Sequence, residues 1–258
     1  MNEKDFFYDF FDLKEKREKQ ISDIYSILLK FENKIIDYEN QDNFDKWLIN
    51  NLLTHSIVIS VSSFQWFLED VIDLLEKYIL NNNIEINKLD KNIYDLVYKK
   101  YSNRIIRDYL IYWEKIKVNE LWNFISKNTF WNLELKNWTS NTLNYSNISE
   151  ILKIFSINFS EIIKSINIEI EDYNFIMNKN VWDRYKINNQ NKIKFFKEFI
   201  WKLTNSRHKV VHWKYITILE KENIYKLFLI TKKYLFNKIL LEIELYLKEY
   251  IREEKFKK

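Results

Sequence analysis

This chain of 258 residues contains no glycine and no proline, the two residues that most strongly mark turns. Helix ends therefore have to be located from clusters of polar residues and from breaks in the apolar periodicity. Alanine is absent as well, whereas Lys, Asn, Ile and Phe are abundant. This composition is typical of a very AT-rich gene, so residue propensities are weaker guides here than the spacing of apolar side chains.

Apolar residues recur at helical spacing over most of the chain. Residues 5–38 predict a long first helix that is broken once, and residues 45–80 predict a second. The second is apolar on more than one face, so we expect it to be the central buried helix. Residues 190–206 and 217–254 predict two more helices. No credible strand pair is present, and the sequence therefore predicts an all-α fold.

The middle of the chain is less regular. We expect interrupted helices at 93–126, a polar irregular stretch at 127–147, and loops or short helices at 168–188. Two short helices are predicted between them, one with its N-cap at Asn147 or Ser149 and its end at Phe155, and one at 159–166. We therefore expect a single domain over residues 1–258, with a motif-bearing core at 45–80 and 190–254 and an insert at about 115–185.

Composition excludes several classes of site and leaves others open. A hydrophobic content of 47% in 258 residues is enough for a sizeable core. No apolar run approaches the roughly 18 residues needed to span a bilayer, so we expect no membrane partner and a cytoplasmic protein. The absence of cysteine excludes disulfides and thiol chemistry. The net charge of +4 permits contact with a polyanion without demanding it.

Scarce residue types gather at one place. The chain has six arginines and three histidines, and "SRHKVVHW" (206–213) contains Arg207, His208 and His212. His208 and His212 are four residues apart, which places them on one helix face and suits a metal pair. A third ligand would have to come from elsewhere, and we expect no metal or other cofactor. The remaining histidine, His55, is interpreted as an ordinary core or surface residue.

Arg207 and His212 form the alternative pair. Arginine can hold a phosphate through two parallel hydrogen bonds, and histidine can take a proton from a ribose 2′-hydroxyl near neutral pH. Together they would cleave RNA without a metal. On an ideal helix the two positions lie about 140° apart, so a long Arg side chain or a loosened helix is needed to bring both to one pocket. The plain alternative is a surface arginine and a packing histidine.

The string "NSRHKVVHW" (205–213) resembles the Arg-x4–6-His motif of the HEPN superfamily, helical domains that include many RNA-cleaving toxins and defence effectors. "SVSSFQWFLEDVIDLL" (60–75) is similar to the early HEPN helix with a polar residue that faces the pair. "FISKNTFWNLELKNWTSNTLNYSNISEILKIFSINF" (124–159) resembles a segment of the RiboL-PSP-HEPN branch. The resemblance covers about residues 45–250 and implies a HEPN-like helical bundle that acts as a homodimer.

The resemblance implies a role for each matched residue. His212 would act as the base on the 2′-hydroxyl, and Arg207 would hold the scissile phosphate. His208 would contact the phosphate or act as the acid, and the product would end in a 2′,3′-cyclic phosphate. HEPN motifs usually have Asn or another small polar residue where this chain has His208. Trp213 stands where the family often has glycine.

Auxiliary residues follow from the same resemblance. Gln65 would orient the Arg–His pair from the neighbouring helix, in place of the more common acid. Glu69, one turn later, and Asn205 are weaker candidates. Basic residues near the motif would attract RNA in a salt-dependent way, or would form an ordinary solvated face; they are Lys202, Lys209 and Lys214.

The nine tryptophans raise a separate hypothesis. Several stand where a turn or close packing would favour glycine, for example Trp131 and Trp138. We consider two explanations: UGA codons that the source organism reads as glycine, or codons that encode tryptophan.

Three functions stay open on the sequence alone. The first is a metal-independent HEPN endoribonuclease with an RNA substrate, a toxin or antiphage effector controlled by an antitoxin or another defence partner. The second is a non-catalytic HEPN dimer scaffold that binds RNA or a protein. The third is an unrelated helical interaction domain.

Overall fold

The computed structural model describes residues 2–82, 84, 88–95, 143–179, 187–213 and 218–257, without the side chains of 212, 213 and 218–220. These ranges are almost entirely helices and short connections, and their only β-pairing is an isolated bridge between Leu89 and Lys257. The all-α prediction is confirmed. The predictions for residues 96–142 and 180–186 lie outside the described residues, as does Lys214.

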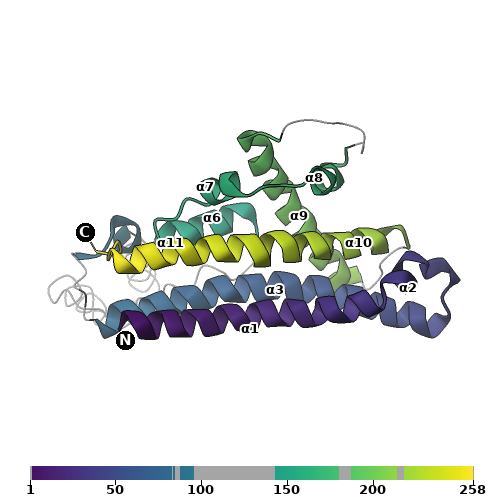
Figure 1. Cartoon of the computed structure of the whole chain (residues 1–258), viewed down its shortest axis with the longest axis horizontal. Coiled ribbons are helices and arrows are strands. Elements are labelled where there is room, and N and C mark those ends of the chain that lie inside the picture. The colour runs from purple at the N-terminus through teal and green to yellow at the C-terminus, as the bar shows by residue number, and fades with distance from the viewer. Residues whose placement is uncertain are drawn as a thin grey trace, which may run out of the picture.

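Three long helical segments lie side by side as a bundle (Figure 1). The first is α1 (Glu3–Lys30), the second is α3 (Asn43–Asn81), and the third consists of α10 (Ile218–Thr231), the π-helical segment η3 (Lys232–Ile239) and α11 (Leu240–Arg252). The short α2 (Glu32–Ile36) and the 3-10 turn η1 (Tyr38–Asn40) connect the first two. The predicted break in the first helix is confirmed and lies at Phe31.

Local chemistry explains where the first helix begins and how it is held. Asn2 and Asp5 form a capping box, in which each side chain accepts a hydrogen bond of 2.9 Å from the backbone N–H of the other. Arg17 Nη2 then pairs with Asp70 Oδ2 at 2.6 Å and ties α1 to α3. Lys14 Nζ contacts a Glu244 oxygen at 2.6 Å and ties α1 to α11.

Helix α3 is the central helix, as its sequence predicts. Buried apolar residues continue along it from Ile49 to Ile79, on more than one face. Burial of its serines costs little free energy, because their hydroxyl groups donate to backbone carbonyl oxygens about one turn earlier. Ser56 donates to Leu53 at 2.7 Å, and Ser60 donates to Ser56 at 2.6 Å. Two neighbouring helices can therefore pack closely on α3 without leaving its hydroxyl groups unpaired.

A second group of helices lies on one side of the bundle (Figure 1). Three short helices pack against α9 (Asn189–Trp213), which crosses the bundle and packs in turn against α3; they are α6 (Tyr145–Ile154), α7 (Phe159–Ser165) and α8 (Ile170–Met177). The Tyr173 and Phe195 rings stack at 6.1 Å between α8 and α9. The predicted short helix at 159–166 and the helical nature of 190–206 are confirmed, and α9 extends further, to Trp213.

The predicted N-cap at Asn147 or Ser149 is wrong. Asn144 has an extended backbone, and its side chain accepts the N–H of Asn147 at 2.8 Å, so α6 begins at Tyr145. Packing favours this earlier start, because the Tyr145 ring lies 5.2 Å from that of Phe159. Ser149 is inside the helix, where its hydroxyl donates to the Tyr145 carbonyl oxygen at 2.9 Å.

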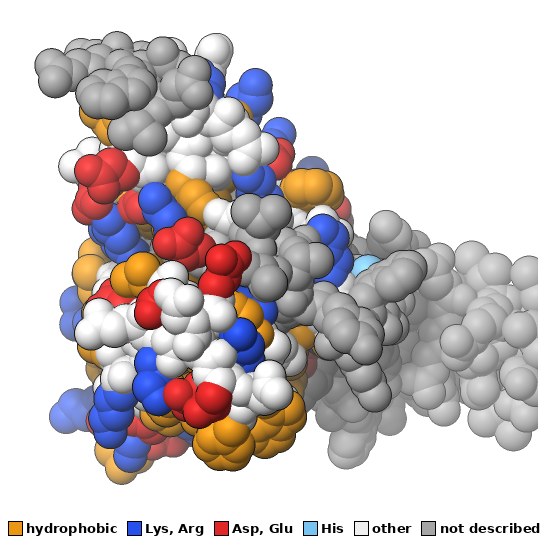
Figure 2. Space-filling view, turned by 90° about the vertical axis from the view of Figure 1, so that its right-hand side faces the viewer, with side chains coloured by type: hydrophobic (Ala, Val, Ile, Leu, Met, Phe, Trp, Pro, Cys, Tyr) orange, Lys and Arg blue, Asp and Glu red, His pale blue; other side chains and the backbone are white. Residues whose placement is uncertain are grey.

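The end of the bundle at which α2 lies is shown from outside in Figure 2. Acidic and basic side chains are interspersed over its described part, and hydrophobic side chains gather at one edge. The first turns of α3 contribute two exposed aromatic residues, Phe44 and Trp47, whose rings stack at 6.1 Å. Across the described ranges, no helix is both long enough and apolar enough to cross a membrane.

Candidate functional site

The Arg–His segment lies at the C-terminal end of α9, which is an unbroken α-helix there. Arg207 follows Leu203 by four positions, so it continues the helix face on which Leu203 is fully buried, and its own side chain is half-buried. The helix is not loosened between positions 207 and 212. The two positions therefore lie about 140° apart around its axis.

Of the two histidines of the segment, the structure describes the side chain of His208 alone. His208 is exposed on the side of α9 away from the face of Leu203. His212 belongs to the last turn of α9, but its side chain lies outside the described residues. The pairing of Arg207 with His212 therefore stays a prediction. The third histidine, His55, is an exposed residue of α3 whose Nδ1 contacts the Asn51 carbonyl oxygen at 2.7 Å.

On α3, the two predicted auxiliary residues contact each other. Gln65 Nε2 donates to Glu69 Oε1 at 3.0 Å, and both side chains are partly buried. They are four residues apart and so lie on one face of the helix. Helix α3 also packs against α9, which is the neighbour relation that the resemblance implies.

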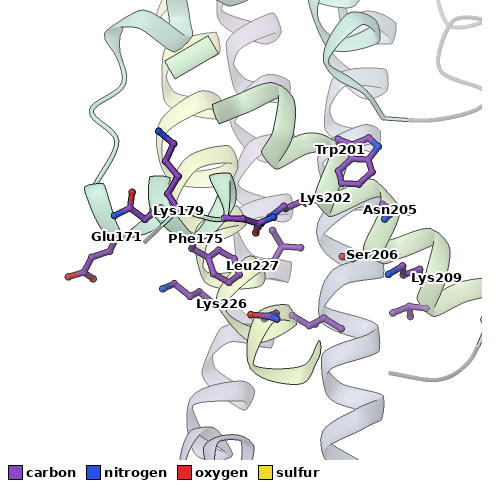
Figure 3. Close-up of a pocket in the computed structure, with 15 residues that line it drawn as sticks. Glu171, Phe175, Lys179, Trp201, Lys202, Asn205, Ser206, Lys209, Lys226 and Leu227 are labelled. Carbon is purple, nitrogen blue, oxygen red and sulfur yellow. Dashed lines mark hydrogen bonds between the residues drawn. The ribbon is translucent and has the colours of Figure 1, made fainter. Parts of the chain in front are cut away.

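A cleft of about 750 Å³ opens between α8, α9 and α10 (Figure 3). We call it the lysine cleft, because its charged groups are Lys179, Lys202, Lys209 and Lys226 with the single carboxylate of Glu171. Three of the predicted residues, Lys202, Asn205 and Lys209, line it together, since they follow one another at helical spacing. Arg207 is not part of its wall.

The other wall of the lysine cleft holds two of these lysines in place. Lys202 Nζ donates to Asn178 Oδ1 at 2.8 Å and lies 6.0 Å from the centre of the Phe175 ring. Lys226 Nζ lies 4.9 Å from the same ring. Burial lowers the pKa of Lys202, although Glu198 acts in the opposite direction. The cleft is therefore a place where positive charge is partly stripped of water and in excess over negative charge.

The shape of this wall follows from how α8 ends. Asn178 has φ 51°, the left-handed conformation that commonly closes a helix, and Asn tolerates it better than most residues. The turn leaves the Asn178 side chain free to accept from Lys202. The cleft also has an apolar wall of three buried residues, Val210, Ile224 and Leu227.

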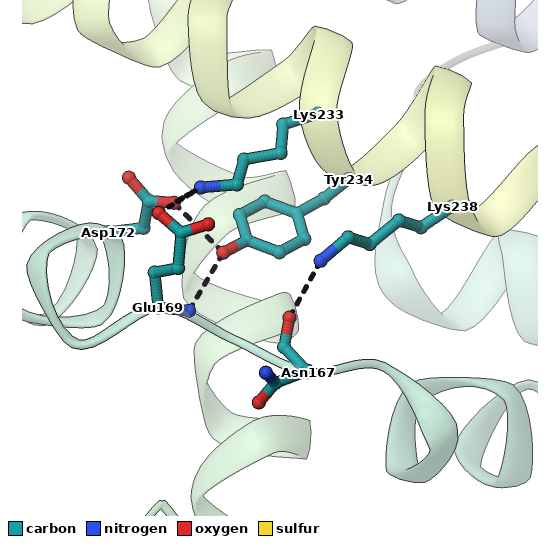
Figure 4. A network of polar contacts seen from close by, with 6 residues as sticks. All are labelled: Asn167, Glu169, Asp172, Lys233, Tyr234 and Lys238. Atoms are coloured by element: carbon teal, nitrogen blue, oxygen red, sulfur yellow. Dashed lines mark hydrogen bonds and ion pairs between the residues drawn. The ribbon is translucent and has the colours of Figure 1, made fainter.

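A polar network fixes the start of α8 on the final helical segment (Figure 4). The Tyr234 hydroxyl donates to Asp172 Oδ2 at 2.9 Å and accepts the backbone N–H of Glu169 at 3.0 Å. Lys233 pairs with both carboxylates and lies 2.8 Å from Asp172. Burial raises the pKa of Tyr234 far above its usual value, so the hydroxyl stays protonated and keeps donating.

Sequence reasoning missed the part of the cleft that does not come from α9. Phe175, Asn178 and Lys226 carry no motif, and they reach the cleft only through the packing of α8 and α10. The signal that was available is the spacing of polar residues on α9: Lys202, Asn205 and Lys209 form a polar stripe on a different face from the buried stripe of Leu203 and Val210.

The described tryptophans bear on the glycine hypothesis. Trp47, Trp66 and Trp201 are 60%, 46% and 57% exposed, and all three are inside helices. None of them has the positive φ that would require glycine; the residues that do, among those described, are Ser156, Asn178 and Glu254. The side chain of Trp213 lies outside the described residues.

Within the described part of the chain, no group of three or more His, Asp or Glu side chains could hold a metal ion. Comparisons of the chain with protein-family models, curated proteins and solved structures found no match.

Proposed function

We propose that this chain is a metal-independent endoribonuclease of the HEPN type that acts as a toxin or antiphage effector. The observation that carries the proposal is a lysine-lined cleft on the same helix turns as the Arg-x4-His segment. Lys202, Asn205 and Lys209 line the cleft, and Arg207 lies between them in sequence on an adjoining face of α9. The packing of α3 against α9 supports the same proposal, because α3 carries Gln65.

The proposed reaction needs no group from outside the protein and RNA. His212 takes the proton of the 2′-hydroxyl, and the 2′-oxygen forms a bond to the adjacent phosphorus. The bond from phosphorus to the 5′-oxygen breaks, and His208 gives that oxygen a proton. Arg207 holds the non-bridging oxygens, where negative charge grows in the transition state. The products are a 2′,3′-cyclic phosphate and a 5′-hydroxyl.

A homodimer is part of this proposal. Positions 207 and 212 are about 140° apart on an unbroken helix. A phosphate that meets both residues therefore has to lie past the end of α9 or between the α9 helices of two copies. The second arrangement matches the cleft between two motifs that the HEPN resemblance implies. An antitoxin or another defence-system partner would hold such a nuclease inactive.

The test compares two double variants on RNA in the presence of EDTA. Arg207→Ala/His212→Ala should lower the cleavage rate by at least about 100-fold, because each residue stabilises the transition state or moves a proton. His55→Ala/Arg252→Ala removes the same residue types from exposed positions elsewhere and should cleave like the wild type. Cleavage that both variants retain, or that EDTA stops, would refute the proposal.

The non-catalytic scaffold is the second candidate, and the same 140° separation favours it. A protein of this kind would bind RNA or a protein partner as a dimer and would cleave no RNA. The absence of cleavage of any RNA, together with normal growth of cells that express the chain, would select this alternative.

A further inference from the structure

The residues that line the lysine cleft include four lysines and one carboxylate. Elsewhere in the described structure, lysines commonly pair with acids; Lys248, for example, contacts Glu244 at 2.5 Å. In the described part of the chain, neither Lys202 nor Lys226 forms an ion pair, although both line the same cleft. Figure 3 shows their side chains on either side of Phe175. Such a cleft favours an anionic ligand.

Two of the ammonium groups are held in position before any ligand arrives. The Phe175 ring attracts both Lys202 and Lys226, at 6.0 and 4.9 Å, and Asn178 accepts a hydrogen bond from Lys202. An anion that binds them loses less side-chain entropy than it would with two mobile lysines. It also relieves the repulsion between like charges and the partial burial of Lys202.

The other side chains of the cleft indicate what kind of molecule carries the anionic group. Val210, Ile224 and Leu227 form an apolar wall, and the amides of Asn178 and Asn205 offer donors and acceptors beside it. The volume of about 750 Å³ falls within the range of small-molecule sites. A ligand that fits has an anionic group such as a phosphate, an apolar portion and polar edges.

We propose that the lysine cleft binds one nucleotide, with its phosphate at Lys202 and Lys226 and its base or sugar against the apolar wall. The nucleotide is either free or part of a single-stranded RNA. The cleft lies on a different face of α9 from Arg207, so this inference does not rest on the proposed cleavage. If the chain does cleave RNA, the cleft holds the strand beside the cleavage point.

The experiment measures binding by calorimetry to the full chain, with adenosine monophosphate, adenosine, inorganic phosphate and a ten-nucleotide single-stranded RNA as probes. Lys202→Gln/Lys226→Gln should weaken nucleotide or RNA binding at least about tenfold, because two charged contacts are lost. Lys16→Gln/Lys19→Gln removes the same charge from exposed positions of α1 and should bind like the wild type. For RNA, the cleft variant should also lower the salt slope by about 0.7 per lysine.

The outcomes separate the sources of the ligand. Binding of the monophosphate that exceeds that of adenosine and of phosphate supports a site for free nucleotides, whereas binding of RNA alone supports a subsite for a strand. A second measurement uses the unaltered chain: the bound probe should protect Lys202 and Lys226 from an amine-reactive reagent. The inference would be overturned by the absence of saturable binding of both adenosine monophosphate and the RNA, by equal weakening in both lysine variants, or by the absence of protection. None of these results depends on whether Arg207→Ala/His212→Ala cleaves RNA.

Discussion

The hydroxyl group of Tyr234 offers the sharpest test of how the lysine cleft is built. Its ring is fully buried against Phe195 and Phe196, at 5.5 and 6.0 Å, and its hydroxyl joins Asp172 to the Glu169 backbone. Tyr234→Phe keeps the ring contacts and removes only the two hydrogen bonds. We expect the start of α8 to loosen, and with it one wall of the cleft.

The size of the effect follows from the partners that remain. A hydrogen bond to a charged group contributes about 1.5–3 kcal/mol, and Lys233 still pairs with Asp172 after the change. Glu169 is exposed, so a water molecule can accept the hydrogen bond from its backbone N–H in place of the hydroxyl. We therefore expect a loss of about 2 kcal/mol in the free energy of unfolding, and a melting temperature lower by roughly 4–8 °C for a chain of this size.

Urea unfolding and calorimetry measure both quantities. Tyr8→Phe is the matched control, because the Tyr8 side chain is 77% exposed and should change stability by less than about 0.5 kcal/mol. If Tyr234→Phe is as stable as this control, the network does not hold α8 in place and the reasoning fails.

Two other predictions concern single residues, and a third concerns the nine tryptophans. Burial acts to raise the pKa of Glu244, but hydrogen bonds from Lys14 and Lys248 outweigh it and hold that pKa below 4.5. Its stabilising contribution is present above about pH 4.5 and is lost as the pH falls through the lowered pKa. The free energy of unfolding, measured with urea, should therefore fall less toward acid pH in Glu244→Gln than in the wild type. An equal fall in both proteins would contradict this. Burial raises the pKa of Glu18, and the charge of Glu244 raises it further, so Glu244→Gln also removes part of the upward shift of the Glu18 pKa. Phe199→Ala should lower the free energy of unfolding by about 3–5 kcal/mol in the same assay, since its fully buried ring packs on Phe195, whereas Leu245→Ala, at 51% exposure, should change it by less than about 0.5 kcal/mol. Sequencing the gene should find UGA among the nine tryptophan codons if some are read as glycine, and nine UGG codons would exclude that reading.

The spacing of apolar residues was sufficient to predict the long helices. It identified α3 despite a β-branched centre, because the apolar pattern continues over 36 residues, from 45 to 80. It ended α9 too early, at 206, because the next three residues, Arg207, His208 and Lys209, are polar and interrupt the apolar pattern. The start of α6 was missed because Asn is so frequent that several candidate caps compete, and only the packing of Tyr145 on Phe159 decides between them.

The π-helical segment was also missed, although the sequence carries a trace of it. Leu229, Tyr234 and Ile239 are five residues apart, whereas an α-helix places residues three or four apart on one face. The wider turns lie where Tyr234 reaches the Glu169–Asp172 segment. A contact between residues 62 positions apart leaves no local pattern, which is why the network could not be predicted.

The candidate site was predictable only on α9. A cluster of scarce residues and a short motif indicated Arg207 and His212, and helical spacing explains why Lys202, Asn205 and Lys209 share a wall. The partners of these lysines come from α8 and α10, and their approach depends on tertiary packing alone.

The central claim, RNA cleavage by attack of the 2′-hydroxyl, is tested most directly with a substrate that lacks this group at one nucleotide. The cleavage position is first mapped on a short RNA, and the same RNA is then made with a 2′-deoxy nucleotide immediately 5′ to the cleaved bond. We predict that the wild-type chain in EDTA leaves a 2′,3′-cyclic phosphate on the normal RNA and does not cut the modified bond. Cleavage of the modified bond, or a product that ends in a 3′-hydroxyl, would contradict the mechanism.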